Sequence, residues 1–544
     1  MLSASGKNNY AMPNDSTVIE NSAGTLAERL AGTSVRHLTV TGSVNGYDLL
    51  LLSSYVRQHS VISLEVNAAG TEVIDNLLFS GCHSLSHIVL PQTVSVSNAA
   101  FYKCTGLTTV KLPKARNIGQ QAFACCDKLR RIDIPVVTEI GKEAFYQCST
   151  LATIDLPRVV TTGEKAFYEC RTLKTISLPM VKNMGREAFA HCGNLRSVSL
   201  PQAKEVENGA FAECAALAYF DAPTATRVGG NEDICGNPGV FSNCKALKEI
   251  VLPEVVEIGN GAFSGCTSLS SIVLPKVRTL GNMAFKSCRS LVFFSLPEVK
   301  AIGSEAFSGC IGINSAFFPK LTVMGKNAFS NCTGLISISM PKLPQLSEGV
   351  FADCAGLEIV NLPLTQTIEN KAFFKTRLRS IDLPHATYMG DSVFAFCSLL
   401  NSVGLPRVKH VGKAALYNCA TLETITLPEV TSIDNDAFSY CLQLRAAILP
   451  QTTDIGNRTF KGCALLKKLV IGGREGSTIG QNVLSVIPDL FLTEPSFTSP
   501  QALGARWGSW GNYYSRYKWN RVYSNYKGKG ALDDSASYEL RWEK

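Results

Sequence analysis

The chain has 544 residues, of which 45% are hydrophobic and 18% are charged, and its formal net charge at pH 7 is +8. This excess is too small to indicate a nucleic-acid-binding protein, which concentrates Lys and Arg along one face. No run approaches the roughly 18 apolar residues of a membrane helix, so no membrane-spanning segment is expected.

The first part of the chain precedes a long internal repeat. Residues 1–22 are rich in Ser and Asn and lack the apolar core of a signal peptide, so they are predicted to form a flexible leader. Residues 23–73 are predicted to form an irregular N-terminal cap, because a terminal repeat must turn one face to water.

Two patterns within this cap predict local structure. Asn45 and Asp48 come directly before the apolar stretch 49–55, which predicts a capped helix. Three leucines are spaced 26 residues apart and are expected in equivalent strand positions: Leu38, Leu64 and Leu90.

A 22-residue unit then recurs through most of the chain. Its most regular position is a phenylalanine, and eighteen copies follow one another with steps of 22 residues, apart from one step of 30 and one of 21. The positions are Phe79, Phe101, Phe123, Phe145, Phe167, Phe189, Phe211, Phe241, Phe263, Phe285, Phe307, Phe329, Phe351, Phe373, Phe394, Leu416, Phe438 and Phe460. A fixed period of roughly 20 to 29 residues is typical of leucine-rich-repeat solenoids.

Within one copy, the apolar spacing predicts a short helix followed by a strand. The helix positions are Ala262, Phe263, Cys266 and Leu269, and the strand positions are Leu269, Ile272 and Leu274. Pro275 ends the strand, because proline cannot donate to a continuing ladder, and Gly281 is expected to turn the chain toward the next helix. About eight apolar positions per copy cannot be buried within that copy, so successive coils are predicted to stack.

The predicted fold is an α/β solenoid, namely a right-handed leucine-rich-repeat superhelix with a parallel β-sheet on one face and short helices or turns on the other. It is predicted to span residues 74–495. An insertion at 228–239 is eight residues longer than the standard return. Insertions in solenoids often carry binding sites, although surface loops also lengthen at little cost.

The consensus L-P-x-V-x-x-I-G-x-x-A-F-x-x-C-x-x-L-x-x-I-x-L-P resembles the BspA-type leucine-rich-repeat proteins, from about Ile74 to Leu492. These proteins are found on the surfaces of anaerobic bacteria and trichomonad parasites. The resemblance implies a secreted or cell-surface protein whose signal segment is absent from this chain. It also implies adhesion to an extracellular, matrix-type protein, although scaffold residues alone do not identify a ligand.

Nineteen cysteines raise the question of disulfides or metal, but seventeen of them stand three residues after the repeat phenylalanine. Equivalent side chains of successive coils are parallel and about 5 Å apart, whereas disulfide Cβ atoms must converge to about 3.8 Å. Reduced, buried cysteines acting as small hydrophobic residues are therefore predicted. Cys125 and Cys235 lie outside this position and are the two candidate exposed thiols. No metal or cofactor is predicted.

Residues 496–544 break the repeat and contain all four tryptophans, among them Trp507, Trp510 and Trp519. One interpretation is an aromatic-rich C-terminal cap that covers the last coil. The other is a surface that binds glycans or a partner, since Trp is a common interface anchor. The two interpretations are compatible, and glycan binding by these tryptophans is the alternative function.

The residues on either side of the core position of each strand are predicted to face outward in two lanes. Most are small and polar, and the aromatic exceptions are Tyr219, Phe293 and Phe317. Phe293 and Phe317 lie on adjacent coils and predict a contact site. Asp133 and Asp155 are expected at roughly the carboxylate separation of a retaining glycosidase, but an open sheet offers no cleft that raises one pKa. Non-enzymatic binding or adhesion is therefore the predicted function.

Overall fold

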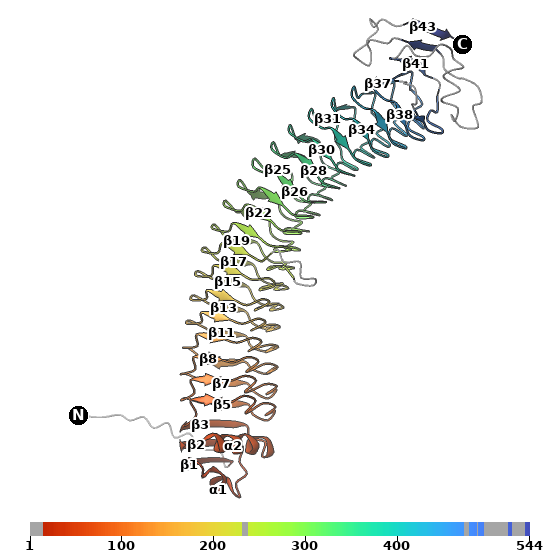
Figure 1. The fold of residues 1–544 in the computed structure, drawn as a ribbon. Coiled ribbons are helices and arrows are strands. Elements are labelled where there is room, and N and C mark those ends of the chain that lie inside the picture. Colours follow the sequence, from red (N-terminus) through yellow and green to blue (C-terminus); the bar gives the residue numbers. More distant parts are fainter. Residues whose placement is uncertain are drawn as a thin grey trace. The chain divides into compact units, whose positions relative to one another are not determined.

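The computed structural model describes residues 15–230, 238–472, 478–486, 488–493, 521–524 and 539–543. The chain divides between Val255 and Val256 into two compact units. Both units consist of the same kind of coil, stacked by parallel strand pairing (Figure 1). The predicted leucine-rich-repeat solenoid is confirmed.

The first unit begins with a cap of long strands and the two helices of the described residues. Its elements are β1 (Ser16–Asn21), α1 (Leu26–Leu30), β2 (His37–Ser43), α2 (Gly46–Gln58) and β3 (Ser63–Ala69). β1 pairs in parallel with β2 along its whole length, and Ile19 in β1 is buried. The part of the predicted leader from Ser16 onward is therefore a strand, because it completes the edge of the cap sheet.

The predicted capped helix is confirmed as α2. The Asn45 side chain accepts a hydrogen bond from the Asp48 N–H at 3.0 Å, and the buried Asp48 carboxylate accepts one from the Asn45 N–H at 3.1 Å. The same carboxylate also accepts from the N–H groups of Gly24 (2.6 Å) and Leu26 (3.2 Å), so it joins the turn before α1 to the start of α2. The two reciprocal hydrogen bonds between Asn45 and Asp48 form a capping box.

The register of the first strands bears out one of the expected leucine equivalences and not the other. Leu38 pairs with Leu64, as predicted, but Leu64 pairs with Ile88. The prediction for Leu90 is wrong, because the step into the first regular coil is two residues shorter than the step within the cap.

Each regular coil of the first unit contributes one three-residue and one two-residue strand. The three-residue strands are β5 (His87–Val89), β7 (Thr109–Lys111), β9 (Arg131–Asp133), β11 (Thr153–Asp155), β13 (Thr175–Ser177), β15 (Ser197–Ser199), β17 (Tyr219–Asp221) and β19 (Glu249–Val251). The two-residue strands are β4 (Val73–Ile74), β6 (Ser95–Val96), β8 (Asn117–Ile118), β10 (Glu139–Ile140), β12 (Thr161–Thr162), β14 (Asn183–Met184), β16 (Glu205–Val206) and β18 (Arg227–Val228).

The second unit repeats this arrangement. Its longer strands are β21 (Ser271–Val273), β23 (Phe293–Ser295), β25 (Ser315–Phe317), β27 (Ser337–Ser339), β29 (Ile359–Asn361), β31 (Ser380–Asp382), β33 (Ser402–Gly404), β35 (Thr424–Thr426), β37 (Ala446–Leu449), β39 (Lys468–Ile471) and β41 (Asp489–Leu492). Its two-residue strands are β20 (Glu257–Ile258), β22 (Thr279–Leu280), β24 (Ala301–Ile302), β26 (Val323–Met324), β28 (Gln345–Leu346), β30 (Thr367–Ile368), β32 (Tyr388–Met389), β34 (His410–Val411), β36 (Ser432–Ile433), β38 (Asp454–Ile455) and β40 (Thr478–Ile479).

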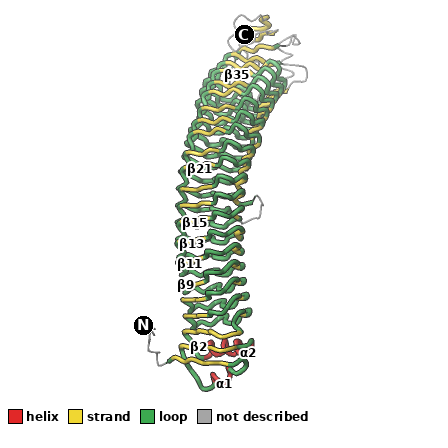
Figure 2. The backbone as a smooth tube through the Cα atoms, turned by 90° about the vertical axis from the view of Figure 1, so that its left-hand side faces the viewer, coloured by secondary structure: helices red, strands yellow, loops and turns green. Residues whose placement is uncertain are grey.

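The segment around each repeat phenylalanine, which we call the turn edge, forms tight turns rather than the predicted short helix (Figure 2). The N–H groups of Gln121, Phe123 and Cys125 donate at 2.7–2.8 Å to carbonyls of the next coil. Gln121 and Cys125 have φ of 54° and 60°. Because these donors point at the neighbouring coil, they are not available for the i−4 bonds of an α-helix.

The repeat phenylalanines stack on one another in the core of each unit, and Leu416 interrupts the stack of the second unit. Phe307 is fully buried, and its ring centroid lies 5.3 Å from that of Phe285 and 4.9 Å from that of Phe329. The planes of these neighbours differ by 7° and 14°. Each coil thus covers the ring of the coil before it, as a solenoid core requires.

The cysteines that follow the repeat phenylalanine are buried, as predicted, and they are also donors. The Cys104 thiol donates to the Phe79 carbonyl of the preceding coil at 3.0 Å, and the Cys354 thiol donates to the Phe329 carbonyl at 3.0 Å. In the shortened coil, Thr376 takes this position, and its hydroxyl donates to the Phe373 carbonyl at 3.0 Å. In these coils the position therefore holds a small side chain with a hydrogen-bond donor.

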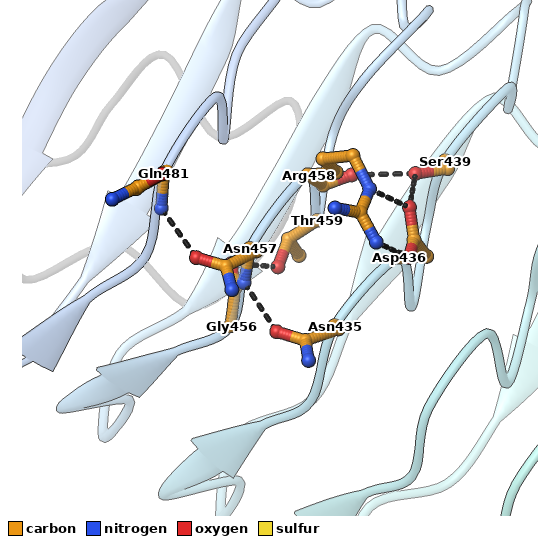
Figure 3. Close-up of polar contacts among 8 residues, drawn as sticks. All are labelled: Asn435, Asp436, Ser439, Gly456, Asn457, Arg458, Thr459 and Gln481. Atoms are coloured by element: carbon orange, nitrogen blue, oxygen red, sulfur yellow. Dashed lines mark hydrogen bonds and ion pairs between the residues drawn. The ribbon is translucent and has the colours of Figure 1, made fainter. Parts of the chain in front are cut away.

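Glycine and asparagine at the start of the turn edge allow successive coils to pack closely. A Cβ on Gly303 would lie 2.5 Å from the backbone of the preceding coil, so the repeat glycine is needed for contact. The following residue often caps the next coil: the Asn435 side chain accepts from the Asn457 N–H, and the Asn457 side chain accepts from the Gln481 N–H, both at 2.6 Å (Figure 3).

The last coil of the second unit is extended by two further strands, β42 (Arg521–Ser524) and β43 (Glu539–Glu543). β41 pairs in parallel with β42, which pairs antiparallel with β43. Tyr523 is buried, and its ring stacks on Phe491 with centroids 4.5 Å apart. An aromatic side chain of the C-terminal segment therefore covers the core of the last coil.

Replacing Phe307 with Ala is expected to lower the free energy of unfolding by about 3–5 kcal/mol, because it leaves a cavity between two stacked rings. Chemical denaturation measures this change. Phe293→Ala provides the control, since Phe293 is 57% exposed. Equal losses in the two variants would contradict the placement of Phe307 in the core.

Replacing Cys354 with Thr is expected to leave the protein about 0.5–1.5 kcal/mol more stable than replacing it with Val, because only Thr retains a donor near the phenylalanine carbonyls. The two substitutions have nearly the same shape, so their difference isolates one hydrogen bond. Unfolding midpoints in urea provide the measurement. A Val variant as stable as the Thr variant would contradict the donor role.

Candidate functional site

The two aromatic residues predicted on the sheet of the second unit are exposed. Phe293 begins β23 and is 57% exposed, and Phe317 ends β25 on the next coil and is 62% exposed. Both side chains alternate with inward-facing neighbours, as the period of a strand dictates. Tyr219 belongs to the first unit, where it begins β17 and is only half-buried. The structure therefore does not join Tyr219 to the other two residues within one unit.

Four exposed aliphatic side chains lie at strand positions, or directly before a strand, in the coils that contain β21, β23, β27 and β29. Val273 and Ile359 are exposed strand residues of β21 and β29, and Val292 and Ile336 are exposed residues directly before β23 and β27. We call the group the sheet patch, and its members are Val273, Val292, Phe293, Phe317, Ile336 and Ile359. The patch extends over five successive coils of the second unit.

The sheet patch is also free of charge. In the four coils that contain β21, β23, β25 and β27, none of the outward strand residues, nor the residue before each strand, is charged. They are Ser270, Ser271, Val273, Val292, Phe293, Ser295, Asn314, Ser315, Phe317, Ile336, Ser337 and Ser339. The equivalent positions of the first unit include Arg130, Arg131, Asp133, Asp155, Lys174, Arg196 and Asp221. An apolar, uncharged face of this extent is typical of a contact surface.

The core beneath the patch is rebuilt around aromatic side chains. Phe294 stands where other coils have Ile, and its ring lies 5.3 Å from Phe307 and 5.8 Å from Phe318. The same position of the next coil holds Ala316, so a small residue follows the large one and the volume is conserved. β23 and β25 belong to separate sheets at this point. Packed rings therefore support the exposed Phe293 and Phe317.

Sequence reasoning identified the aromatic members of the patch and missed the aliphatic ones. Val292 and Ile336 stand one position before the strand, outside the two lanes that strand alternation defines. The local signal was the absence of charge over four coils, which can be read from the sequence once the outward positions are known.

The other candidate positions do not form a chemical site. Asp133 and Asp155 are exposed and belong to separate sheets. Cys82 is fully buried, whereas the His83 ring contacts the Thr105 hydroxyl at 3.0 Å on the surface. Among the described residues, no cluster of His, Cys, Asp or Glu could hold a metal ion.

Several of the buried thiols have a raised pKa. Burial raises the pKa of Cys192 from 9.0 to about 12 and that of Cys397 to about 11. No disulfide joins the cysteines of the described ranges. Cys125 is partly exposed, as predicted, and burial also raises its pKa.

Several predicted positions lie outside the described residues. They are Trp507, Trp510, Trp519, Cys235 and most of the insertion at 228–239. Glycan binding by the C-terminal tryptophans therefore stays a prediction.

Stacked coils with an open sheet define a leucine-rich-repeat scaffold, a class of proteins that bind other macromolecules on extended surfaces. The chain belongs to the BspA-type leucine-rich-repeat family. The family model, described as a BspA type leucine rich repeat region in 6 copies, matches residues 72–180, 116–234, 160–288, 236–358 and 366–487. Neither helix of the described residues is long and apolar enough to cross a membrane.

Two of the solved structures with similar folds are bacterial leucine-rich-repeat proteins. A leucine-rich repeat protein from Bacteroides ovatus is 28% identical, with 70% of this chain and 82% of that chain covered and a TM-score of 0.43. A leucine rich cell surface protein from Faecalibacterium prausnitzii is 21% identical, with 68% and 89% covered and a TM-score of 0.27. No curated protein matches the chain.

The buried thiols are expected to make the protein less stable as the pH rises above about 9. Unfolded thiols ionise near pH 9, whereas the folded thiols of Cys192 and Cys397 remain protonated up to about pH 11. The unfolded state then binds fewer protons, so stability falls with rising pH. Urea midpoints between pH 8 and pH 9.5 measure this fall. The urea midpoint of the triple variant Cys148→Val, Cys192→Val, Cys214→Val should fall less steeply with rising pH. An equal slope would show that these buried thiols do not cause the fall.

Proposed function

We propose that this protein is a non-enzymatic, secreted or cell-surface adhesion protein that recognises an extracellular macromolecule, most simply a matrix-type protein, through the sheet patch. The observation that carries the proposal is that five of the six exposed apolar side chains lie on four successive coils whose outward sheet positions carry no charge. A protein that only needed a soluble scaffold would keep polar or charged residues there, as most other coils do.

The character of the patch favours a protein partner. Exposed aromatic side chains are frequent interface anchors, and the loss of charge at the centre of a patch is the compositional mark of an interface core. The packed rings of Phe294, Phe307 and Phe318 beneath it hold the surface in place. Little conformational entropy would then be lost on binding.

Membership in the BspA-type family supports an extracellular location. The similar protein from Faecalibacterium prausnitzii is itself described as a cell surface protein. The alternative proposal remains glycan recognition by Trp507, Trp510 and Trp519, and the experiment below separates the two.

The double variant Phe293→Ala with Phe317→Ala is expected to bind about tenfold or more weakly to whichever member of a panel of purified extracellular-matrix proteins binds the unmodified chain. Two large side chains that each contribute more than about 1 kcal/mol account for this factor. Biolayer interferometry on immobilised matrix proteins provides the measurement.

The matched control is Val323→Ala with Tyr388→Ala. These residues are 59% and 44% exposed, belong to the same unit and lie in the two-residue strands β26 and β32. The control should bind normally. Binding that survives Phe293→Ala with Phe317→Ala but is lost on Trp507→Ala with Trp510→Ala would overturn the sheet patch in favour of the C-terminal tryptophans.

A further inference from the structure

A second surface of the second unit carries a run of aromatic rings that the repeat does not require. Phe374, Phe396, Tyr417 and Tyr440 come from four consecutive coils of the turn edge. Their ring centroids follow one another at 5.5, 5.4 and 5.4 Å. We call this row the aromatic strip. Successive planes are inclined by 78°, 56° and 66°, so the rings pack edge against face.

Two of these rings stand on backbone that disfavours them. Phe396 and Tyr440 lie two residues after the repeat phenylalanine and have φ of 64° and 63°. Bulky residues are rare in this left-handed region. Other coils of the unit place Gly at the same position, as at Gly265 and Gly309, or a polar residue such as Asn331. Because the same position is left-handed in coil after coil, the large aromatic side chains, and not the backbone conformation, distinguish Phe396 and Tyr440.

The strip remains accessible to a ligand. Phe396 is 40% exposed, and the other three rings are half-buried. The Tyr440 ring lies over Gly462 of the next coil, where a Cβ would come within 2.8 Å of a ring carbon. The strip therefore covers backbone on one side and meets solvent on the other.

Cations stand at both ends of the strip. The Lys375 Nζ lies 5.0 Å from the centroid of Phe374, and the Lys461 Nζ lies 5.9 Å from that of Tyr440. Over the five turn-edge segments from 370–377 to 457–464, six Lys or Arg residues accompany two Asp residues. The Asp436 carboxylate is engaged by Arg458, which donates to it at 2.9 and 2.6 Å (Figure 3). Lysine ammonium groups therefore stand at both ends of the strip, and the Lys375 Nζ also lies 3.7 Å from the Asp353 carboxylate. The middle of the strip is close to neutral.

The first unit carries a shorter row of tyrosines on the equivalent edge. Tyr146 and Tyr168 stack there at 5.2 Å, and the Lys165 Nζ lies 5.7 Å from the Tyr168 ring centroid. Burial raises the pKa of both phenols. The carboxylates of Glu169 and Glu187 raise both further, and that of Glu143 also raises the pKa of Tyr146.

We propose that the aromatic strip binds an acidic polysaccharide in which charged and neutral sugars alternate. A strip one ring wide suits a chain-like ligand, since a stable protein interface needs about 800 Å² per partner. Aromatic faces bind the C–H faces of sugar rings, and the lysines at the two ends meet carboxylates that are spaced apart. A nucleic acid carries a phosphate on every nucleotide and would place several of them against the neutral middle. This surface is separate from the sheet patch and does not rest on the proposed function.

The test uses the full chain and titrates it with sodium hyaluronate oligosaccharides, neutral dextran and poly(dT) in a calorimeter. Hyaluronate is expected to bind and the other two ligands are not. The double variant Phe396→Gly with Tyr440→Gly should weaken hyaluronate binding about tenfold or more. Its unfolding midpoint should be unchanged or raised, because glycine adopts the left-handed conformation without strain.

Two further variants make the test specific. Asn331→Gly alters the same repeat position elsewhere in the unit (φ 59°) and should bind normally. Lys375→Gln with Lys461→Gln should weaken binding and flatten its dependence on salt. Phe293→Ala with Phe317→Ala should bind hyaluronate normally, so failure of the sheet patch and failure of the strip can be told apart.

Three results would overturn the proposal. They are no binding of hyaluronate, binding of dextran or poly(dT) that is as tight, and undiminished hyaluronate binding by a folded Phe396→Gly, Tyr440→Gly variant.

Discussion

Within each unit, the structure depends on hydrogen bonding between the backbones of successive coils. The strand ladders and alternate residues of the turn edge direct their N–H groups to the neighbouring coil, as the bonds from Gln121, Phe123 and Cys125 illustrate. Each coil must therefore present the same donors and acceptors at the same places. This requirement explains why close approach needs a glycine at Gly303 and why a side chain such as that of Asn435 accepts from the N–H of the next coil.

The same constraint gives the cysteine position its chemistry. The carbonyl of the repeat phenylalanine lies in a core without water. A hydrogen bond from a side-chain donor therefore helps to satisfy this buried acceptor. A thiol is small enough for the space between stacked rings and still donates to the carbonyl of the preceding coil. Thr376 replaces it with a hydroxyl that donates to the Phe373 carbonyl of its own coil. Burial raises the pKa of thiols such as Cys192 and Cys397, and no disulfide joins the cysteines of the described residues.

Function is then confined to positions that the stacking does not use. The outward sheet residues of the second unit change from polar to apolar over a few coils, while the core below exchanges Ile for Phe294 and then Ala316 without altering the fold. The aromatic strip lies on the turn edge. The left-handed backbone at Phe396 and Tyr440 would accept glycine more easily, so the fold does not require aromatic side chains there. Both surfaces consist of repeat positions at which stacking does not determine the residue type. One scaffold can therefore carry different binding sites.

The period, the phenylalanine stack and the buried cysteines could be predicted from the sequence alone, because a repeated apolar pattern can be buried only by stacking. The register of the cap could be predicted for Leu38 and Leu64 but not for Leu90, since a two-residue shortening of a return leaves no local mark. The turn edge was predicted as helix because Ala262, Phe263, Cys266 and Leu269 have helical spacing. Only the tertiary structure decided for turns, because the Phe263 N–H donates to Ala284 of the next coil, while the N–H groups of the other three donate to carbonyls three residues back. It also decided which side chains share a surface, because the aliphatic residues of the sheet patch and the rings of the strip become neighbours only when the coils are stacked.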